Sequence, residues 1–445
     1  MLKLKKIKDS LSSFQIIILG FVGVILLGAV ILMFPVSSAD GVYTPFADAL
    51  FTATSAVCVT GLVVYDTATY WSDFGQVIIL ILIQIGGLGV VTVASLLALL
   101  AGKKISLMQR QTMQNALSVP QVGGIVRLTK FIILTSFSIE TCGALLLMPV
   151  FVPKYGIKGI WMSVFHSVSA FCNAGFDIMG SETGEFSSLT SFAYNPYITI
   201  VISALIIIGG LGFITWDDIV TKKFNLKAYR MQSKVIITTT LILIVVPAII
   251  FFAFCFDGHS LEEKICLSVF QAITPRTAGF NTADLTSLPD IGIIITILLM
   301  LVGGSPGSTA GGMKTTTLAV LFSNIIAVFR KRESANYFGR RVDDSVVKNA
   351  SALLMLYSTL AITSALVITQ IDGISIKEGL FETFSAIGTV GLSLGVTPGL
   401  SHISHTILII LMFWGRVGGL TIIYAAFSNK DTTASKYPQE SIMIG

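Results

Sequence analysis

Four stretches of the chain can be laid over one another: ALFTATSAVCVTGL at residues 49–62, SVFHSVSAFCNAGF at 163–176, SVFQAITPRTAGF at 268–280 and GLFETFSAIGTVGL at 379–392. Each begins with a small residue, an aliphatic residue and a phenylalanine, continues for about two helical turns and then reaches a glycine. These glycines are Gly61, Gly175, Gly279 and Gly391. Repetition of one pattern along the whole chain indicates four copies of one structural unit.

The composition points to lipid as the solvent. The chain is 53% hydrophobic and 12% charged, whereas about a quarter of the residues of an ordinary soluble domain are charged. The first apolar stretch is too long for a secretory signal, so we expect a retained span with a cytoplasmic amino terminus. Hydropathy predicts spans near 14–34, 74–101, 131–152, 197–215, 235–256, 291–302 continuing into 313–329, 350–371 and 405–427, which makes eight.

The basic residues indicate how the chain is oriented. With the amino terminus inside, 22 of the 29 lysines and arginines fall in the tails and in the loops around 102–130, 216–234 and 330–349, as the positive-inside rule requires. Because they are dispersed between spans rather than gathered on one domain, the net charge of +5 does not predict nucleic acid as a partner. Membrane lipid is the expected neighbour.

The repeated segments are too short to cross the membrane and are predicted to be re-entrant. Irregular backbone at membrane depth must be buried in protein or line a wet cavity, and four equivalent loops can share one cavity on a pseudo-fourfold axis. Each loop is expected to descend as a half-helix and return as a strand whose carbonyl oxygens replace the hydration shell of an alkali cation. Glycine suits this strand because it tolerates the backbone angles required.

The candidate filter consists of each loop glycine and the two residues before it. Thr389-Val390-Gly391 matches the first half of the TVGYG filter of potassium channels. The other loops carry Val59-Thr60-Gly61, Asn173-Ala174-Gly175 and Thr277-Ala278-Gly279. Close helix packing through small residues is the alternative explanation for the loop glycines. The third loop is one residue shorter from Phe to Gly and contains Arg276, so only approximate fourfold symmetry is expected.

The predicted architecture is an all-α integral membrane protein of four tandem helix, pore loop, helix repeats around one pore per subunit. The expected units are 1–115, 116–230, 231–345 and 346–445. A second glycine pattern recurs after each loop, where we expect packing or kinking of the helix. It reads GGLG at 86–89, GGLG at 209–212, GGSPG at 303–307 and GRVGGL at 415–420.

The sixth span is interrupted by glycines and a proline that cannot sustain a helix. We expect two half-helices around a flexible hairpin that gates the pore; a kink without a gating role is the alternative. Lys314 and Arg416 fall within spans, where burying a cation costs at least about 2.5 kcal/mol. Arg416 is interpreted as an electrostatic barrier, a clasp on the hairpin or a structural group, and Lys314 could instead extend to the cytoplasmic surface. The candidate gate residues are Gly303, Gly304, Ser305, Pro306, Gly307, Ser308, Thr309, Ala310, Gly311, Gly312, Lys314 and Arg416.

The four loops, the string TAGFN at 277–281 and GGSPGSTAGGMK at 303–314 resemble the Trk/Ktr/HKT superfamily of potassium transporters over nearly the whole chain, with the bacterial Ktr membrane subunit as the closest match. The resemblance implies potassium uptake across the bacterial cell membrane by a homodimer with one pore per subunit. It also implies a cytosolic ring of nucleotide-binding regulatory (KtrA-like) subunits, and an intramembrane loop that blocks the inner pore when the regulator is inactive. Members with serine in place of the first filter glycine tend to pass sodium, so Gly61 favours potassium.

Two enzyme-like strings lack the context they need. Residues 303–307 match the nucleophile elbow GxSxG, which requires a strand-to-helix turn; an intramembrane protease using Ser305 would also need a histidine at that depth. Residues 307–315 approach a phosphate-binding loop, but Met313 stands where a glycine should precede the lysine, so no nucleotide is expected on this chain. An ion-coupled solute symporter is the remaining alternative, although such carriers usually have two repeats.

Overall fold

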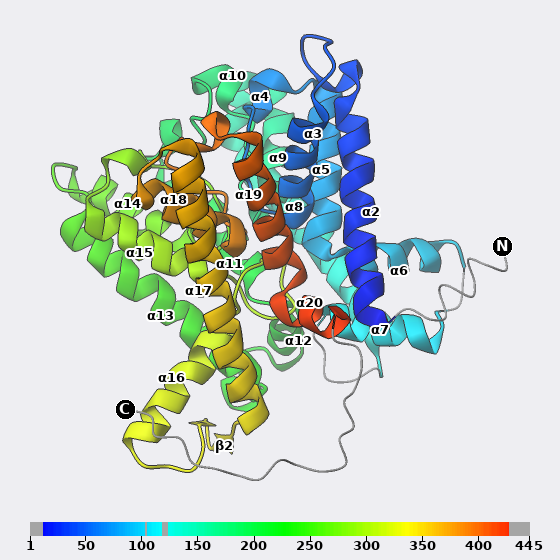
Figure 1. Cartoon of the computed structure of the whole chain (residues 1–445), viewed down its shortest axis with the longest axis vertical. Coiled ribbons are helices and arrows are strands. Elements are labelled where there is room, and N and C mark those ends of the chain that lie inside the picture. Colours follow the sequence, from blue (N-terminus) through cyan, green and yellow to red (C-terminus); the bar gives the residue numbers. More distant parts are fainter. Residues whose placement is uncertain (1–11, 103–104, 118–122, 427–445) are drawn as a thin grey trace.

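The computed structural model describes residues 12–102, 105–117 and 123–426. Most of the basic amino-terminal tail and all of residues 427–445, both assigned to the cytoplasmic side, lie outside the described residues. Almost every regular element that the structure describes is an α-helix (Figure 1). The exceptions are short 3-10 helices and an antiparallel hairpin formed by β1 (Asn336–Tyr337) and β2 (Arg340–Arg341).

The helices follow one order four times: a long helix, a short helix that leads to a loop glycine, and a second apolar helix that is broken. The first unit contains α2 (Ser13–Met33), α3 (Phe46–Cys58), α5 (Asp73–Leu88) and α6 (Val90–Leu100). The second contains α8 (Ile125–Tyr155), α9 (Lys158–Cys172), α11 (Pro196–Gly210) and α12 (Phe213–Lys222). The third contains α13 (Met231–Phe254), α14 (Leu261–Ile273), α15 (Asp290–Leu301) and α16 (Thr315–Phe329). The fourth contains α17 (Asp344–Asp372), α18 (Ile376–Gly388), α19 (His402–Val417) and α20 (Gly419–Ala426).

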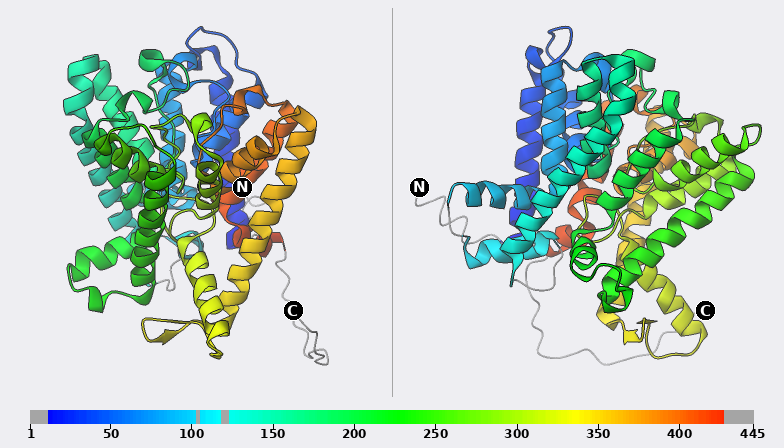
Figure 2. Two further views of the ribbon diagram at one scale, coloured as in Figure 1. Left: turned by 90° about the vertical axis from the view of Figure 1, so that its left-hand side faces the viewer. Right: turned by 180° about the vertical axis from the view of Figure 1, so that it is seen from behind.

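Shorter elements connect these helices at both ends of the molecule (Figures 1 and 2). They are η1 (Pro35–Ser37), α4 (Thr67–Tyr70), α7 (Leu107–Leu117), α10 (Gly180–Thr183), η2 (Thr190–Phe192), η3 (Leu226–Ala228), η4 (Leu285–Ser287) and η5 (Thr397–Gly399). Serine caps begin several of the helices. Ser12, Ser260 and Ser375 each form a capping box with the residue three positions later, which satisfies free N–H groups at the helix start.

The predicted spans are present, but three of them bend sharply. Among the described residues, α2, α8, α13 and α17 are each long and apolar enough to cross a bilayer, and three further spans are pairs bent by 95° (α5 and α6), 100° (α11 and α12) and 93° (α19 and α20). With α15 and α16, which flank the interruption, these helices correspond to the eight predicted spans.

The span predicted over 74–101 is sharply bent at its glycine pattern, where packing or kinking of the helix was expected. The helix ends at Leu88 and the chain turns at Gly89, whose φ of +86° is left-handed. Gly212 and Gly418 make the same turn, both with a φ of +91°. Hydropathy does not detect these turns because the residues on both sides are apolar, whereas the left-handed backbone that only glycine adopts readily makes the turn possible.

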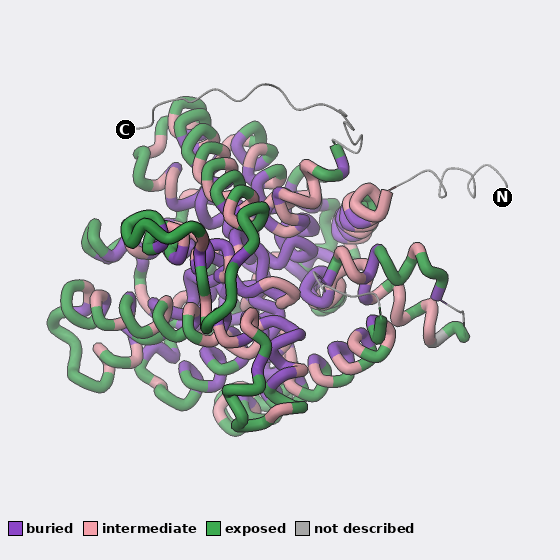
Figure 3. The backbone as a smooth tube through the Cα atoms, turned by 90° about the horizontal axis from the view of Figure 1, so that it is seen from below, coloured by how far each residue is buried: buried purple, intermediate pink, exposed green. Residues whose placement is uncertain are grey.

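The four short helices lie at the centre of the molecule. The phenylalanines that begin the repeated pattern, Phe51, Phe165, Phe270 and Phe381, are all at most 1% exposed. Seen from below, the buried trace lies at the centre and exposed residues lie toward the rim (Figure 3). The long helices leave apolar side chains such as Leu27, Leu134 and Leu366 exposed on their outer faces. Such faces suit lipid, which has the same polarity as these side chains.

Candidate ion-conduction site

The four loop glycines form a closed ring, called here the glycine ring. A Cβ placed on any of them would lie against the backbone carbonyl oxygen that precedes the glycine of another loop. The pairs are Gly61 with Ala174, Gly175 with Ala278, Gly279 with Val390 and Gly391 with Thr60. The loops therefore surround one axis in chain order, and a carbonyl oxygen from each loop lies at the ring. No side chain fits at these positions.

The backbone of each loop is left-handed at two alternate positions. The glycines have φ values of +70° to +92°, and the residue two positions earlier is also left-handed, at +51° to +71°. Those earlier residues are Val59, Asn173, Thr277 and Thr389. Positive φ is unusual for β-branched residues, and such strain costs about 1–3 kcal/mol each and clusters at functional sites. Alternation of handedness turns successive carbonyl groups toward the same side.

A hydroxyl group on each short helix anchors its loop, and the sequence analysis missed these residues. Ser55 and Ser385 each accept a hydrogen bond from the N–H of their own loop glycine, both at 3.1 Å. Ser169 and Thr274 instead donate to the carbonyl oxygen of the residue after the glycine, at 2.6 and 2.7 Å. All four stand four residues after the repeated phenylalanine. The recurrence of a hydroxyl residue at this position in all four repeated segments could have identified these anchors from the sequence.

Several polar atoms of the candidate filter are buried without a hydrogen-bond partner in the described part of the chain. They are the hydroxyl oxygens of Thr60, Thr277 and Thr389 and the amide oxygen of Asn173. Leaving a buried acceptor unsatisfied costs about 1–3 kcal/mol. Oxygens of this kind around a shared axis form a set of hard ligands that suits an alkali cation or its remaining water molecules.

The interrupted sixth span forms a hairpin of residues 302–314 directly beneath the loops. Its backbone is held by other units: Ser305 N donates to the carbonyl oxygen of Gly210 (2.9 Å), and Gly312 N to that of Gly415 (3.1 Å). Thr309 Oγ1 accepts a hydrogen bond from Asn173 Nδ2 at 3.0 Å. The break between α15 and α16 was predicted from the glycines and Pro306, and it is present.

The hairpin also contacts the other loops. A Cβ on Gly303 would lie 3.0 Å from the methyl group of Thr277, and one on Gly311 would overlap the hydroxyl of Thr389. Together with the bond between Thr309 and Asn173, these contacts reach the first residue of three of the four filter triplets. The hairpin therefore lies across the inner end of the glycine ring.

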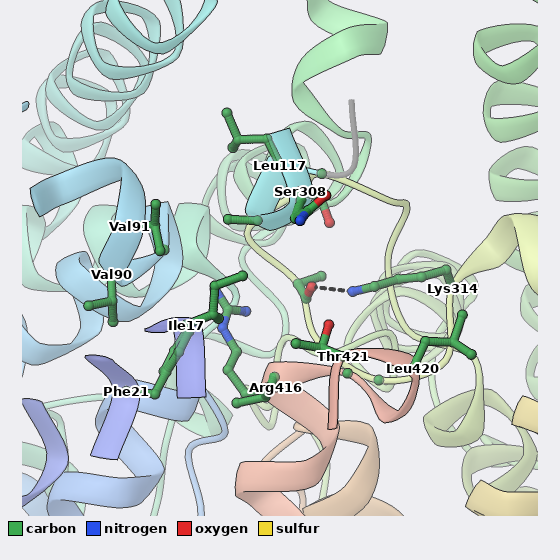
Figure 4. Close-up of a pocket in the computed structure, with 18 of the residues that line it drawn as sticks. Ile17, Phe21, Val90, Val91, Leu117, Ser308, Lys314, Arg416, Leu420 and Thr421 are labelled. Atoms are coloured by element: carbon green, nitrogen blue, oxygen red, sulfur yellow. Dashed lines mark hydrogen bonds between the residues drawn. The ribbon is translucent and has the colours of Figure 1, made fainter. Parts of the chain in front are cut away.

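The two intramembrane cations both bind the hairpin. Arg416 Nη1 donates to the carbonyl oxygen of Thr309, while Nη2 donates to those of Gly86 (2.5 Å) and Gly87 (3.1 Å) in the first unit. Lys314 Nζ donates to the carbonyl oxygens of Ala310 and Gly311, at 2.8 and 3.2 Å. Lys314 therefore turns toward the hairpin rather than extending away from it. Figure 4 shows both side chains on the wall of one pocket.

A cavity lies on each side of the glycine ring. The inner one, of about 230 Å³, is lined by Arg416, Lys314, Ser308 and Leu117 among others (Figure 4). The outer one, of about 80 Å³, is lined by all four ring glycines together with Asp66 and Asp177. Along this axis the carboxylates therefore lie on one side of the carbonyl oxygens of the ring, and the hairpin with its two cations lies on the other.

Two further charged residues within the apolar regions bond to spanning helices and not to the filter triplets. Arg276 is 7% exposed, and its Nη2 lies 3.5 Å from Thr240 Oγ1 on the long helix α13. On α8, both carboxylate oxygens of Glu140 accept a hydrogen bond from Gln84 Nε2 of α5, at 2.9 and 3.2 Å. Although the third loop is one residue shorter and contains Arg276, its Gly279 still lies in the ring. Glu140 links the second unit to the first.

Ser305, the serine of the GxSxG string, is not part of a catalytic arrangement. Its Oγ is 3.0 Å from Thr315 Oγ1, and no histidine within the described residues hydrogen-bonds to either hydroxyl. His166 bonds to the carbonyl oxygen of Met162, and His405 to that of Thr397. Ser305 thus helps to close the two ends of the hairpin.

Comparison with known proteins identifies the family. The sequence model of the TrkH family, described as cation transport proteins, matches residues 4–436. The chain belongs to the TrkH family. Two relatives cover it almost completely: the potassium/sodium uptake protein NtpJ of Enterococcus hirae, 40% identical over 99% of both proteins, and the Ktr system potassium uptake protein B of Bacillus subtilis, 38% identical over 97% of this chain and 96% of that protein.

A solved TrkH structure has the same fold. The potassium transporter TrkH from Vibrio parahaemolyticus is similar to this TrkH-family chain with a TM-score of 0.74, 17% sequence identity and coverage of 92% of this chain and 83% of that one. The predicted all-α membrane fold and the resemblance to the Trk/Ktr/HKT superfamily are confirmed. Because the relatives are named for ion uptake, the chain is a multi-pass membrane transport protein.

Proposed function

We propose that this protein carries potassium into the cell across the plasma membrane, along the axis of the glycine ring. The observation that carries the proposal is the ring itself: four loops in chain order, each presenting a carbonyl oxygen beside the glycine of another loop. Carbonyl oxygens replace the water shell of a dehydrated alkali ion. The short helices also end at the ring, and the negative ends of their dipoles favour a cation there.

The filter is proposed to consist of the four triplets. They are Val59, Thr60, Gly61, Asn173, Ala174, Gly175, Thr277, Ala278, Gly279, Thr389, Val390 and Gly391. The oxygens of Thr60, Asn173, Thr277 and Thr389 support this set, because they lie in the same loops and have no hydrogen-bond partner among the described residues. Potassium is the proposed main cargo. One relative is named for potassium and sodium uptake, so sodium is the ion against which selectivity should be measured.

We propose that the hairpin of residues 302–314 is the gate. It touches the inner residues of three loops, so ions leaving the ring toward the cytoplasm require it to move. Arg416 is proposed to hold it closed, because one guanidinium group bonds both Thr309 of the hairpin and the glycines of α5. Lys314 stabilises the hairpin's own conformation by binding two of its carbonyl groups.

We further propose a homodimer that works with a cytosolic ring of nucleotide-binding (KtrA-like) subunits. The support is that one full-length relative is named as component B of a Ktr system, together with a basic surface around the β1–β2 hairpin. Arg330, Lys331, Arg332, Arg340 and Arg341 lie there, all exposed. Holding topology against anionic lipid is the other role for such residues. Co-purification of the regulator with wild type, and its loss when these residues are neutralised, tests the docking role.

The test of the filter is complementation of a potassium-uptake-deficient cell by Gly61→Ser, Gly175→Ser, Gly279→Ser and Gly391→Ser. A Cβ at any of these sites meets a carbonyl oxygen of another loop, so each variant should lose its preference for potassium over sodium. Gly399→Ser is the matched control, because an added Cβ there meets no atom of the described chain within 4 Å apart from its sequence neighbours. Rescue unaffected by all four ring substitutions would defeat the proposal. Sodium dependence of wild-type uptake in the same assay tests the symport alternative.

A further inference from the structure

Two histidines and an aspartate converge at the end of the molecule opposite the hairpin, outside the four proposed filter triplets. Asp48 lies in the first turn of α3, and His402 and His405 lie one turn apart at the start of α19. One ligand atom from each residue lies within 4.8 Å of the other two. Within the described residues, this is the one group of three such side chains close enough to share a metal ion.

The hydrogen bonds around the cluster prepare it for a metal. His405 Nε2 is 2.8 Å from the carbonyl oxygen of Thr397. A carbonyl only accepts, so Nε2 carries the proton and Nδ1 keeps its lone pair. Asp48 Oδ2 accepts the hydroxyl of Tyr65 at 2.9 Å, which leaves Oδ1 available. Outer partners of this kind orient histidine and carboxylate ligands in metal sites.

The buried Asp48 carboxylate lacks a lysine or arginine partner among the described residues, so a bound cation could balance its charge. Asp48 is 6% exposed, and it forms no salt bridge with a lysine or arginine in the described part of the chain. Burying an unpaired carboxylate is costly. The cluster lines a cavity of about 590 Å³ that also contains Asp40, Asp66 and Glu185. An acidic wall of this kind attracts cations from outside, and the exposed His402 leaves an entry route.

We propose that Asp48, His402 and His405 bind a Zn²⁺ ion from the extracellular side. Two imidazoles and one carboxylate are a donor set that suits zinc and leaves a fourth position for water, whereas potassium and calcium prefer oxygen ligands. With bonds of about 2.0–2.2 Å, a tetrahedral ion brings its ligand atoms to about 3.3–3.6 Å from one another. The ligand atoms must therefore move closer together than the 4.8 Å limit within which they lie. The exposed His402 side chain is free to make this movement.

The bound ion joins two distant parts of the chain. α3 leads directly into the first filter triplet, and α19 follows the fourth loop, so zinc ties the first unit to the last on the outer surface. The inference depends only on the three side chains and their surroundings. It therefore stands or fails separately from the proposed potassium uptake.

The experiment is a titration of the purified full-length protein in lipid nanodiscs with Zn²⁺. Calorimetry measures zinc binding, and a thermal melt measures the change in melting temperature that zinc causes. Wild type is expected to bind one Zn²⁺ per chain and to melt at higher temperature with zinc, because a ligand that binds the folded state stabilises it. His402→Ala, an exposed position suited to substitution, should weaken binding by at least about tenfold. Asp48→Asn should do the same.

The control is His259→Ala, which removes another histidine of the same side that lies outside the cluster. It should bind zinc as wild type does. The inference is overturned if wild type binds no zinc, or if His402→Ala and Asp48→Asn both retain wild-type affinity and the same rise in melting temperature.

Discussion

At the scale of single residues, charged side chains of opposite sign line the cavities on the two sides of the glycine ring. Asp66 and Asp177 line the outer cavity beside the glycine ring, and Arg416 and Lys314 line the inner one. An outer carboxylate raises the local concentration of cations. An inner cation opposes their passage unless its charge is engaged elsewhere, as the guanidinium of Arg416 is by three carbonyl groups.

Removing the Arg416 side chain should open the gate. Arg416→Ala deletes the bonds to Thr309, Gly86 and Gly87, and hydrogen bonds to a charged group contribute about 1.5–3 kcal/mol each. Loss of one such bond to the hairpin should raise basal potassium flux without regulator roughly tenfold or more. Potassium flux into proteoliposomes measures this effect. Arg416→Lys is the comparison variant, because it keeps the positive charge but loses the planar guanidinium group that binds several carbonyl groups at once. Unchanged conductance and regulation in Arg416→Ala would indicate a structural role.

Uptake should fall when the outside is acidified below neutrality. Partial burial, together with the nearby Asp66 carboxylate, raises the pKa of Asp177 to about 7. The group is therefore ionised and attracts cations above pH 7, and it becomes neutral as the pH falls below 7. Initial uptake rates at pH 8 and pH 6 should differ in wild type and converge in Asp177→Asn. Glu262→Gln, an exposed outer carboxylate, should keep the wild-type profile, and a wild-type profile in Asp177→Asn would refute the assignment.

At the scale of elements, glycines let the spanning helices approach the ends of the short helices. Gly86, Gly209 and Gly415 each lie so close to a short helix that a Cβ would overlap its backbone carbonyl oxygen, at Val57, Phe171 and Ile387. Each of these carbonyls is four residues before a loop glycine. In the third unit the hairpin occupies the corresponding region, so one of the four similar glycine patterns forms the hairpin, whereas the other three form close contacts and bends.

Filling one of these contacts should destabilise the protein. Gly86→Ala introduces a Cβ against the carbonyl of Val57, and overpacking of this kind costs about 1–3 kcal/mol. The melting temperature in detergent should fall. Gly23→Ala is the matched helical control, because an added Cβ there meets no described atom within 4 Å outside its own helix backbone. Glycine is also less favourable than alanine within a helix. Equal melting temperatures for the two variants would contradict the packing argument.

Shortening the hairpin should also raise basal flux. Deletion within residues 304–311 removes the segment that reaches Asn173 and Thr389, so the inner end of the ring loses its cover while α15 and α16 remain. Flux with and without the regulator measures the effect, with monodisperse elution of the purified variant as the check on folding. The same flux as wild type under both conditions would remove the gating role.

At the scale of the whole molecule, the long helices form an apolar exterior around a buried, irregular centre. The outer faces of α2, α8 and α17 expose leucines, whereas the loops at the ring are inaccessible to lipid. The basic β1–β2 hairpin extends from one end (Figure 1). This separation satisfies the requirement that backbone without regular hydrogen bonding be shielded from hydrocarbon.

The positive-inside distribution predicts the direction in which the molecule sits. In a cysteine-free background, His259→Cys should react with a membrane-impermeant maleimide added to intact cells. Lys331→Cys should react only after the membrane is permeabilised, because its basic loop is assigned to the cytoplasm. The reverse pattern would show that the orientation is wrong, and with it the direction of uptake.

The sequence by itself determined the features that are encoded locally. Glycines that follow a phenylalanine by nine or ten residues identified the four loops. Hydropathy identified the spans, and the glycines with Pro306 identified the break that became the hairpin. Each of these signals lies within a few residues of the feature it predicts, where backbone preference and hydrophobicity act directly.

Only the tertiary structure decided which distant groups meet. Arg416 binds carbonyl groups of Thr309 and Gly86, and Asp48 meets His402 and His405, across most of the chain's length. The glycine pattern at 86–89 predicted packing or kinking there, but only the packed structure set the size of the bend, which is 95°. Such contacts depend on how whole helices pack around the axis, and that packing is a sum of many weak interactions that no short stretch of sequence contains.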